Sequence, residues 1–277
     1  MLKITASEVK VISEYIKNLT GIYLDASKGY LLETRLSSIA ESLACKNYLD
    51  LQQKASQDVS KKIERQIVDA ISTNETLFFR DKGPFELLQH KLLPELIDAR
   101  GKGVLRPHLR IWSAAASTGQ ELYSVAIVIR ELLQKDTGKY GLHLFGTDIS
   151  DTAIQQASYG KYNKFEIERG LDGATLRKYF TLFGDSWKVR DELRAMVKFQ
   201  KFNLMHPFTA LGKFDVILCR NVAIYFTTDD RKKLFDKLAD SLANDGFLII
   251  GSTESLTGIC SRFEPRRHLR SIFYQKK

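Results

Sequence analysis

Residues 111–124, with the sequence IWSAAASTGQELYS, constrain the fold of this chain more than any other stretch. We interpret Ile111 to Ala114 as the end of a buried strand, Ala115 to Gln120 as a tight loop of small residues, and Glu121 onward as an amphipathic helix. This order predicts the first unit of a doubly wound α/β sheet. The loop of such a unit lies outside the carboxyl ends of the strands, where its amides face a ligand. Small side chains let that ligand approach the main chain closely.

The loop disfavours two common kinds of nucleotide site. It contains no G-x-G-x-x-G and no Gly-Lys followed by Ser or Thr, which argues against a dehydrogenase and a P-loop enzyme. Glu121 opens the helix, and its carboxylate suits hydroxyls or a cation better than phosphates. S-adenosylmethionine, with a ribose and a positive charge, fits this pattern. The alternative is an ordinary connection at 117–119, with Glu121 as a first-turn acid favoured by the helix dipole. These residues alone do not choose between the two.

Strands and helices then alternate to the end of the chain. Strands are predicted at 109–114, 143–147, 197–202, 214–218, 246–251 and 271–275, and helices at 121–133, 152–158 and 228–242. A short helix (LDGATLRKYF) and a hairpin (TLFGDSWKV, turning at 184–186) interrupt the sheet between Gly160 and Lys201. A late hairpin at the sheet edge is typical of class I methyltransferases.

Polar side chains follow two of these strands. Asp148 closes the second strand, where an acid is well placed to accept hydrogen bonds from both ribose hydroxyls. Together with the glycine-poor loop, it favours adenosine held without a pyrophosphate. Asn221 and Tyr225 follow a later strand, at the carboxyl edge of the sheet where ligands gather.

The first seventy residues predict a small helical bundle. Helices are expected at 5–19, which has a capping box of Thr5 and Glu8, and at 28–43 and 60–71. Their apolar stripes require nothing beyond packing. A further helix starts at Pro84, and Pro94 is expected to bend or end it.

The segment 72–81, STNETLFFRD, breaks the helical period. Asn74 and Thr76 offer short hydrogen-bonding side chains, Phe78 and Phe79 can anchor the segment, and Arg80 supplies a rigid guanidinium suited to a carboxylate. Such a segment can lie across a neighbouring pocket. The alternative is a helix cap with two core phenylalanines.

Composition narrows the class of protein. The 277 residues allow one large and one smaller domain, and apolar runs such as FDVILC are far shorter than the roughly 20 residues that span a bilayer. The amino terminus lacks the features of a secretory signal, so we expect a cytosolic protein. Cys45, Cys219 and Cys260 are expected to be reduced core residues, and the histidines lack ligand spacing, so we predict no metal.

The formal net charge of +9 invites a nucleic-acid interpretation. The excess lies in the second half of the chain: residues 1–70 hold ten Lys and Arg against nine Asp and Glu, residues 160–201 ten against six, and residues 261–277 six against one. Because acidic protein surfaces attract such a patch as phosphates do, charge alone cannot choose between these partners.

Five motifs in register, TNETLFFRD, IWSAAASTGQELYS, FGTDIS, CRNVAIYF and GSTESL, resemble the successive signatures of the CheR-type chemotaxis receptor glutamate methyltransferases. The similarity covers nearly the whole chain. It implies a class I, Rossmann-like methyltransferase sheet with an inserted small antiparallel β subdomain, preceded by a small all-α domain. The corresponding divisions are a helical domain at 1–71, a linker at 72–84 that contributes to the donor pocket, and a methyltransferase domain at 85–277 with its insertion at about 160–196.

The resemblance also implies S-adenosylmethionine as methyl donor and the γ-carboxylate of receptor glutamates as acceptor. By matching motif positions, the implied donor pocket consists of Asn74, Thr76, Arg80, Glu121, Asp148, Asn203, Leu204, Arg220 and Asn221. Arg80 and Tyr225 match the positions closest to the chemistry. The implied partner is the cytoplasmic domain of methyl-accepting receptors, and we expect a monomer that neither binds nucleic acid nor inserts into a membrane.

Two departures from the family pattern limit what is carried over. Family members often carry a run of arginines on the second helix, whereas here Arg35 and Leu36 are followed by SSIAES, so docking through that helix is in doubt. Members that tether a receptor's carboxyl-terminal pentapeptide have a longer, glycine-containing loop in the inserted hairpin. FTLFGDSWKV turns tightly, and we predict that this protein does not use the tether.

Two other functions compete with this interpretation. A nucleic-acid methyltransferase is suggested by the pI of about 9.3, but the fourth strand is followed by RNVA rather than by an Asn or Asp with two prolines, and no Pro-Cys pair is present. A catalytically idle adaptor that binds the donor as a signal is suggested by the altered second helix.

Overall fold

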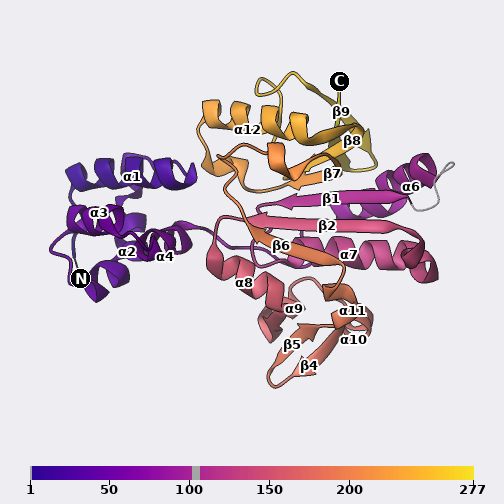
Figure 1. The fold of residues 1–277 in the computed structure, drawn as a ribbon, viewed down its shortest axis with the longest axis horizontal. Coiled ribbons are helices and arrows are strands. Elements are labelled where there is room, and N and C mark those ends of the chain that lie inside the picture. The colour runs from indigo at the N-terminus through magenta and orange to yellow at the C-terminus, as the bar shows by residue number, and fades with distance from the viewer. Residues whose placement is uncertain (1, 102–106) are drawn as a thin grey trace.

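The computed structural model describes residues 2–101 and 107–277, which form a helical amino-terminal part and a larger α/β part (Figure 1). The amino-terminal bundle contains α1 (Ala6–Thr20), a 3₁₀ turn η1 (Ala26–Lys28), α2 (Gly29–Ser42), α3 (Tyr48–Gln57) and α4 (Lys62–Ile71). The capping box at Thr5 is present, and Gly21 ends α1 in the left-handed conformation. The sequence pattern did not predict α3, because only Tyr48, Leu51 and Ala55 are buried along it.

The α/β part contains the predicted doubly wound sheet, which has seven strands in the order β6-β2-β1-β7-β8-β10-β9, and β9 is the one strand of this sheet that the sequence did not predict. The strands are β1 (His108–Ala114), β2 (Gly141–Asp148), β6 (Val197–Lys201), β7 (Phe214–Cys219), β8 (Leu242–Ile250), β9 (Phe263–His268) and β10 (Ser271–Lys276). The first five are parallel, whereas β10 runs antiparallel to β8 and to β9. The predicted late edge hairpin is therefore confirmed. The arrowheads of β1 and β2 point toward the amino-terminal helices (Figure 1).

Helices cover both faces of the sheet. One core cluster packs α7 (Gln120–Leu133) and the helical run 83–101 against β1, β2 and β7. A second cluster packs α12 (Thr228–Ser241) against the opposite face around the fully buried Trp112. The same part of the chain also contains α8 (Asp151–Tyr159) and the 3₁₀ turns η3 (Gln134–Lys139), η4 (Thr209–Leu211) and η5 (Ala223–Tyr225).

The helical run 83–101 continues past Pro94. It consists of α5 (Gly83–Leu87), a π-helical segment η2 (Leu88–Leu92) and α6 (Leu93–Gly101). The Leu93 N–H donates to the Leu88 carbonyl, one residue further back than in an α-helix. This wider turn lies directly before the proline, whose ring conflicts with regular α-helical packing of the preceding turn. The helix therefore does not end at Pro94.

A second, three-stranded antiparallel sheet interrupts the α/β pattern. Its strands β3 (Lys161–Asn163), β4 (Phe180–Phe183) and β5 (Ser186–Val189) pair in the order β3-β5-β4 and are accompanied by α9 (Lys164–Glu168), α10 (Gly173–Tyr179) and α11 (Asp191–Arg194). The predicted hairpin and short helix are β4–β5 and α10. Gly170, before α10, lies so close to the main chain of 78 that a Cβ built on it would be 1.9 Å from the Phe78 carbonyl oxygen. Only glycine fits there.

Candidate active site

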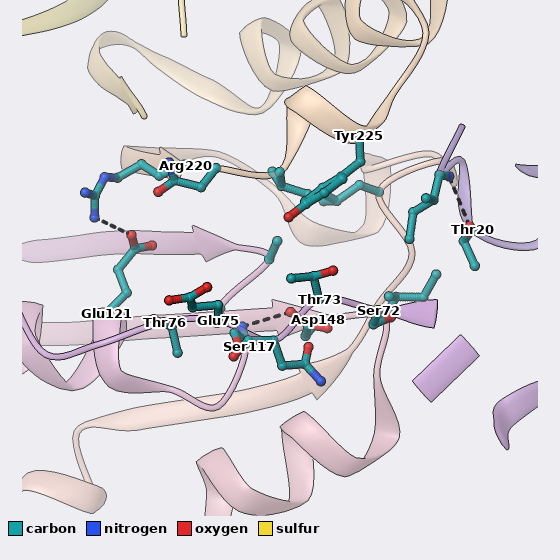
Figure 2. A pocket seen from close by; sticks show the side chains of 18 of the residues that line it. Thr20, Ser72, Thr73, Glu75, Thr76, Ser117, Glu121, Asp148, Arg220 and Tyr225 are labelled. Atoms are coloured by element: carbon teal, nitrogen blue, oxygen red, sulfur yellow. Dashed lines mark hydrogen bonds and ion pairs between the residues drawn. The ribbon is translucent and has the colours of Figure 1, made fainter. Parts of the chain in front are cut away.

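A cavity of about 850 Å³, its open mouth included, lies at the carboxyl edge of the sheet beside the amino-terminal domain. It sits where the strand order reverses between β1 and β7, the usual ligand position in an open α/β sheet. All of the residues nominated from the sequence line it: Asn74, Thr76, Arg80, Glu121, Asp148, Asn203, Leu204, Arg220, Asn221 and Tyr225. Figure 2 shows Thr76, Glu121, Asp148, Arg220 and Tyr225 around the cavity, together with Thr20 from the amino-terminal domain.

The loop after β1 folds tightly because three of its residues are left-handed. Ala115, Ser117 and Gly119 have φ of 66°, 50° and 96°. At Gly119, a Cβ would lie 2.9 Å from the Ala157 Cβ, so glycine lets α8 approach the loop. The turn directs the Ser117 N–H toward the carboxylate that ends β2, and the loop and second strand thus meet at the floor of the cavity (Figure 2).

Asp148 is held in place by two main-chain donors. The Ser117 N–H donates to Oδ2 at 2.8 Å and the Ser150 N–H donates to Oδ1 at 3.0 Å. Burial raises the pKa of this carboxyl above its usual range. Each oxygen keeps a further lone pair, so Asp148 can still accept hydrogen bonds from a ligand's hydroxyls.

Glu121 faces a cation, as its chemistry suggested, but that cation belongs to the protein. Arg220 Nη1 lies 2.8 Å from Glu121 Oε2 (Figure 2). The Ser113 hydroxyl donates to Glu121 Oε1 at 2.7 Å. The Arg220 side chain is only 1% exposed, and its Nη2 donates to Asp81 and to the Arg80 carbonyl, each at 2.9 Å. Glu121 is therefore more than a first-turn acid. It neutralises a buried guanidinium, and a cationic ligand group would share its carboxylate.

The segment 72–82, which we call the strap, lies along the cavity between α4 and α5. The Ser117 hydroxyl donates to the Asn74 carbonyl at 3.1 Å, and the Phe79 N–H donates to the Ser124 hydroxyl at 3.0 Å. Phe78 is fully buried, with its ring 5.0 Å from that of Tyr162. The polar residues of the strap line the cavity, Phe78 is a core residue, and Phe79 is only partly buried against the same core.

Arg80 occupies a strained part of the strap. Its neighbours Phe79, Asp81 and Lys82 have φ of 52°, 66° and 40°, a conformation that non-glycine residues rarely adopt. Arg80 Nη1 donates to the Glu75 carbonyl at 3.0 Å, which folds the guanidinium back along the strap. Strain of this kind persists where the surroundings fix the backbone, and it is concentrated at functional sites.

The amino-terminal domain supplies lining residues that the sequence did not reveal. Thr20 and Ile22, at the end of α1, line the cavity. The Asn203 side-chain amide donates to the Leu19 carbonyl at 2.9 Å, and the Tyr23 N–H donates to the Tyr225 carbonyl at 2.8 Å. Asn203, nominated for the donor pocket, thus also joins the two domains. Nothing in the helical stripe of α1 signals this contact, because it depends on how the domains dock.

Tyr225 and Asn221 line the cavity from the segment that follows β7. The Tyr225 hydroxyl points into the cavity in Figure 2. Asn221 is left-handed, with φ of 58°, and its N–H donates to Glu254 Oε2 at 2.9 Å. The same oxygen accepts from the Gly251 N–H at 2.7 Å. Glu254, in the GSTESL motif, therefore fixes the turn that carries Asn221, a role that we did not predict.

Arg35 on α2 turns inward. It donates to the carbonyls of Ala70, Ile71 and Ser72 and to the Thr73 hydroxyl, where the strap begins. The three cysteines are buried and unpaired, as predicted. Across residues 2–101 and 107–277, no group of three His, Cys, Asp or Glu is arranged to hold a metal ion. None of the described helices is long and apolar enough to cross a membrane.

The polar groups of the cavity match S-adenosylmethionine. Asp148 offers acceptors for ribose hydroxyls, Glu121 a carboxylate for an ammonium group, and Arg80 a guanidinium for a carboxylate. Arg220 also keeps a buried Nε–H that has no partner among the described residues, so a donor remains available beside the cavity. An apolar part of the cavity wall is formed by Ile22, Leu204 and Phe226.

Comparison with known proteins agrees with this geometry. The family model for the CheR methyltransferase SAM-binding domain matches residues 74–270, and that for the CheR methyltransferase all-alpha domain matches residues 7–72. The chemotaxis protein methyltransferase Cher2 of Pseudomonas putida is 36% identical over 95% of both chains. Chemotaxis protein methyltransferase 1 of Vibrio cholerae is 38% identical over 100% of this chain and 99% of its own. Its namesake in Pseudomonas aeruginosa is 34% identical over 98% of both. The chain therefore belongs to the CheR methyltransferase family and carries that family's all-alpha and SAM-binding domains.

Proposed function

We propose that this protein transfers a methyl group from S-adenosylmethionine to the γ-carboxylate of glutamates in methyl-accepting chemotaxis receptors. The observation that carries the proposal is the single cavity in which Asp148, Glu121, Arg80 and Tyr225 converge. The names of the relatives, chemotaxis protein methyltransferases, support the choice of acceptor. Bound in this cavity, S-adenosylmethionine supplies an electrophilic methyl group on a sulfonium.

On the donor side, each residue has a proposed task. Asp148 accepts hydrogen bonds from the ribose hydroxyls, and Asn203 and Leu204 border the base. Glu121, already paired with Arg220, adds negative charge for the donor's ammonium group. Asn74, Thr76 and Asn221 complete the enclosure, and residues 72–84 serve as a linker that belongs to the donor pocket.

On the acceptor side, the chemistry needs no general base. A glutamate side chain is ionised near pH 7, because its ordinary pKa is about 4.3. The protein contributes alignment of the two reacting atoms and exclusion of water. The Tyr225 hydroxyl orients the acceptor oxygen, and the Arg80 guanidinium holds a carboxylate of either the donor or the acceptor.

We further propose how the protein meets its partner. The acceptor is the cytoplasmic domain of a receptor, reached by a monomer in the cytoplasm without insertion into the membrane or binding of nucleic acid. Arg35 bonds within the protein, which supports docking that does not depend on a basic second helix. The β4–β5 hairpin turns through Gly184 and Asp185 alone, which supports independence from a receptor pentapeptide.

The test is incubation with labelled donor and one of three acceptors: receptor cytoplasmic fragments with the carboxyl-terminal pentapeptide, the same fragments without it, and RNA. We expect equal labelling of both fragments, none of the RNA, and mass spectrometry that places the methyl groups on glutamates. Label in RNA alone would establish the nucleic-acid function. Binding of donor and receptor with no methanol released by alkali from the receptor would establish the idle adaptor.

A further inference from the structure

Asp69, near the end of α4, contacts the start of α8 across the domain boundary. Its Oδ1 accepts from the Ser150 hydroxyl at 2.7 Å, and its Oδ2 accepts from the Thr152 hydroxyl at 2.8 Å. The Thr152 N–H adds a longer contact to Oδ1 at 3.4 Å. One carboxylate from the amino-terminal domain therefore binds the first turn of a helix in the methyltransferase domain. Figure 1 shows α4 beside α8 at this boundary.

Ser150 links this contact to the cavity. Its hydroxyl is the N-cap of α8, accepting from the Ala153 N–H at 3.1 Å while donating to Asp69. Its main-chain N–H donates to Asp148 Oδ1. Ser150 is fully buried, so its orientation is set by these few partners. Asp69, Ser150 and Asp148 thus form a chain of hydrogen bonds that ends on a lining residue of the cavity.

We propose that Asp69 is a positioning residue for the donor ribose, acting through Ser150 on the Asp148 carboxylate. The inference rests on the proposed function, because Asp148 is there the acceptor for the ribose hydroxyls. It assigns to the amino-terminal domain a part in donor recognition beyond the lining residues Thr20 and Ile22.

Charge and geometry predict opposite effects of the loss of Asp69 on donor affinity, so a binding measurement can test the proposal. Burial is the main cause of the raised pKa of Asp148, and the negative charge of Asp69 raises it further. By charge alone, removing Asp69 would favour ionised Asp148 and strengthen its acceptance of hydroxyls. By geometry, the turn at Ser150 would lose its anchor, and ribose binding would weaken.

The experiment measures binding of two nucleosides by calorimetry: S-adenosylhomocysteine and its 2′-deoxy analogue. The wild-type protein should prefer the parent compound, and the ratio of the two Kd values reports the contact with the 2′-hydroxyl. Asp69→Ala should raise the Kd of S-adenosylhomocysteine about 5- to 30-fold, the equivalent of one to two kcal/mol, and should reduce the ratio. Asp69→Asn keeps an oxygen acceptor for Ser150, so its Kd for S-adenosylhomocysteine should lie between those of the wild type and Asp69→Ala.

A matched control separates this role from a general loss of charge or stability. Glu14→Gln removes a carboxylate from an exposed position on α1 of the same domain and should change neither Kd nor the ratio. Thermal unfolding of each variant identifies the temperature at which all are folded, and binding is compared there. If Asp69→Ala is insoluble, Thr152→Ala takes its place. This variant removes one of the two hydroxyls that bind Asp69 and should reduce the ratio of the two Kd values in part.

The outcomes that overturn the proposal are distinct from failure of the proposed function. The positioning role is refuted if folded Asp69→Ala shows the same ratio of the two Kd values as the wild type. It is also refuted if this variant binds S-adenosylhomocysteine more tightly than the wild type does. A wild-type protein that does not distinguish the two nucleosides refutes it as well, together with the ribose assignment of Asp148. Absence of receptor methylation with an intact ribose ratio refutes the proposed acceptor and leaves the role of Asp69 supported.

Discussion

Arg220 and Glu121 form a buried ion pair, with Nη1 and Oε2 2.8 Å apart, that connects the loop after β7 to the first turn of α7. Asp81 from the strap contacts the same guanidinium at 2.9 Å. Three separate segments of the wall are therefore held by one positive charge. Taking charges out of water is costly, so such an arrangement is stable only while its partners are complete.

Loss of the Glu121 carboxylate should destabilise the protein. In Glu121→Ala, Arg220 keeps Asp81 but loses a charge-assisted hydrogen bond, so we expect a decrease of about 2–3 kcal/mol in the free energy of unfolding. Glu121→Gln retains an acceptor and should cost less. Urea denaturation of both variants measures the difference. Equal stability of wild type and Glu121→Ala would show that the pair contributes nothing.

Arg80→Ala should lower kcat/KM for receptor fragments about 10- to 100-fold, because a charge-assisted hydrogen bond to a carboxylate is lost. Arg80→Lys should recover only part of this activity, since an ammonium cannot reproduce the two-pronged guanidinium contact. Receptor binding by Arg80→Ala should remain intact. The measurement is the initial rate of methyl transfer, and full activity of Arg80→Ala contradicts the proposed role.

Tyr225→Phe should reduce kcat about 10- to 100-fold and leave the Kd of S-adenosylhomocysteine nearly unchanged. The substitution removes only the hydroxyl that points into the cavity and keeps the ring. Single-turnover kinetics and calorimetry separate the two effects. A larger Kd with an unchanged kcat would move Tyr225 from the acceptor side to the donor side.

Phe78 should be critical for both stability and donor binding. Its fully buried ring packs edge-on against Tyr162 at 5.0 Å and Phe180 at 5.3 Å. Phe78→Ala should cost about 3–5 kcal/mol of unfolding free energy, and the loosened strap should also raise the donor Kd. Phe78→Leu keeps much of the volume and serves as the milder comparison. Destabilisation without any change in donor Kd would separate the strap from the pocket.

The pH dependence of stability should show the contribution of Asp58, which precedes α4. Hydrogen bonds from the Ser60 hydroxyl and the Ile63 N–H hold the pKa of Asp58 at about 2, below its usual 3.8. Since the folded pKa is lowered, the carboxylate stabilises the fold above pH 3.8, and this contribution is lost as the pH falls toward 2. The difference between the thermal unfolding midpoints of wild type and Asp58→Ala should be largest at pH 5 and should shrink as the pH falls through 2. A constant difference would contradict the shift.

The residues at the carboxyl edge of the sheet were predictable because strand order and strand ends determine them. Asp148 ends one strand and Asn221 follows another, and the ends of parallel strands meet at one edge. The contacts of Asp69 with Ser150 and Thr152, and the place of Thr20 in the cavity wall, were not predictable, since both arise from packing of the two domains. The helices of Asp69 and Thr20 carry only an apolar stripe in the sequence, and a stripe specifies which face is buried but not what lies against its polar flank.

The partners of Glu121 could not be predicted from the sequence either. Its position favoured a hydroxyl or cationic ligand, yet the nearest cation is Arg220, 99 residues further along the chain. A buried ion pair between distant residues leaves no periodic pattern. The helix α3 was missed for a related reason, because its short stripe falls below what periodicity can distinguish from a turn-rich segment.

The absence of a side chain at Gly170 has a consequence for engineering the inserted β subdomain. Main chain meets main chain there, so a side chain at position 170 would force the subdomain away from the strap that carries Phe78. A chimaera that imports the subdomain from another protein must bring a glycine to this position, or it will displace the wall it is seated on.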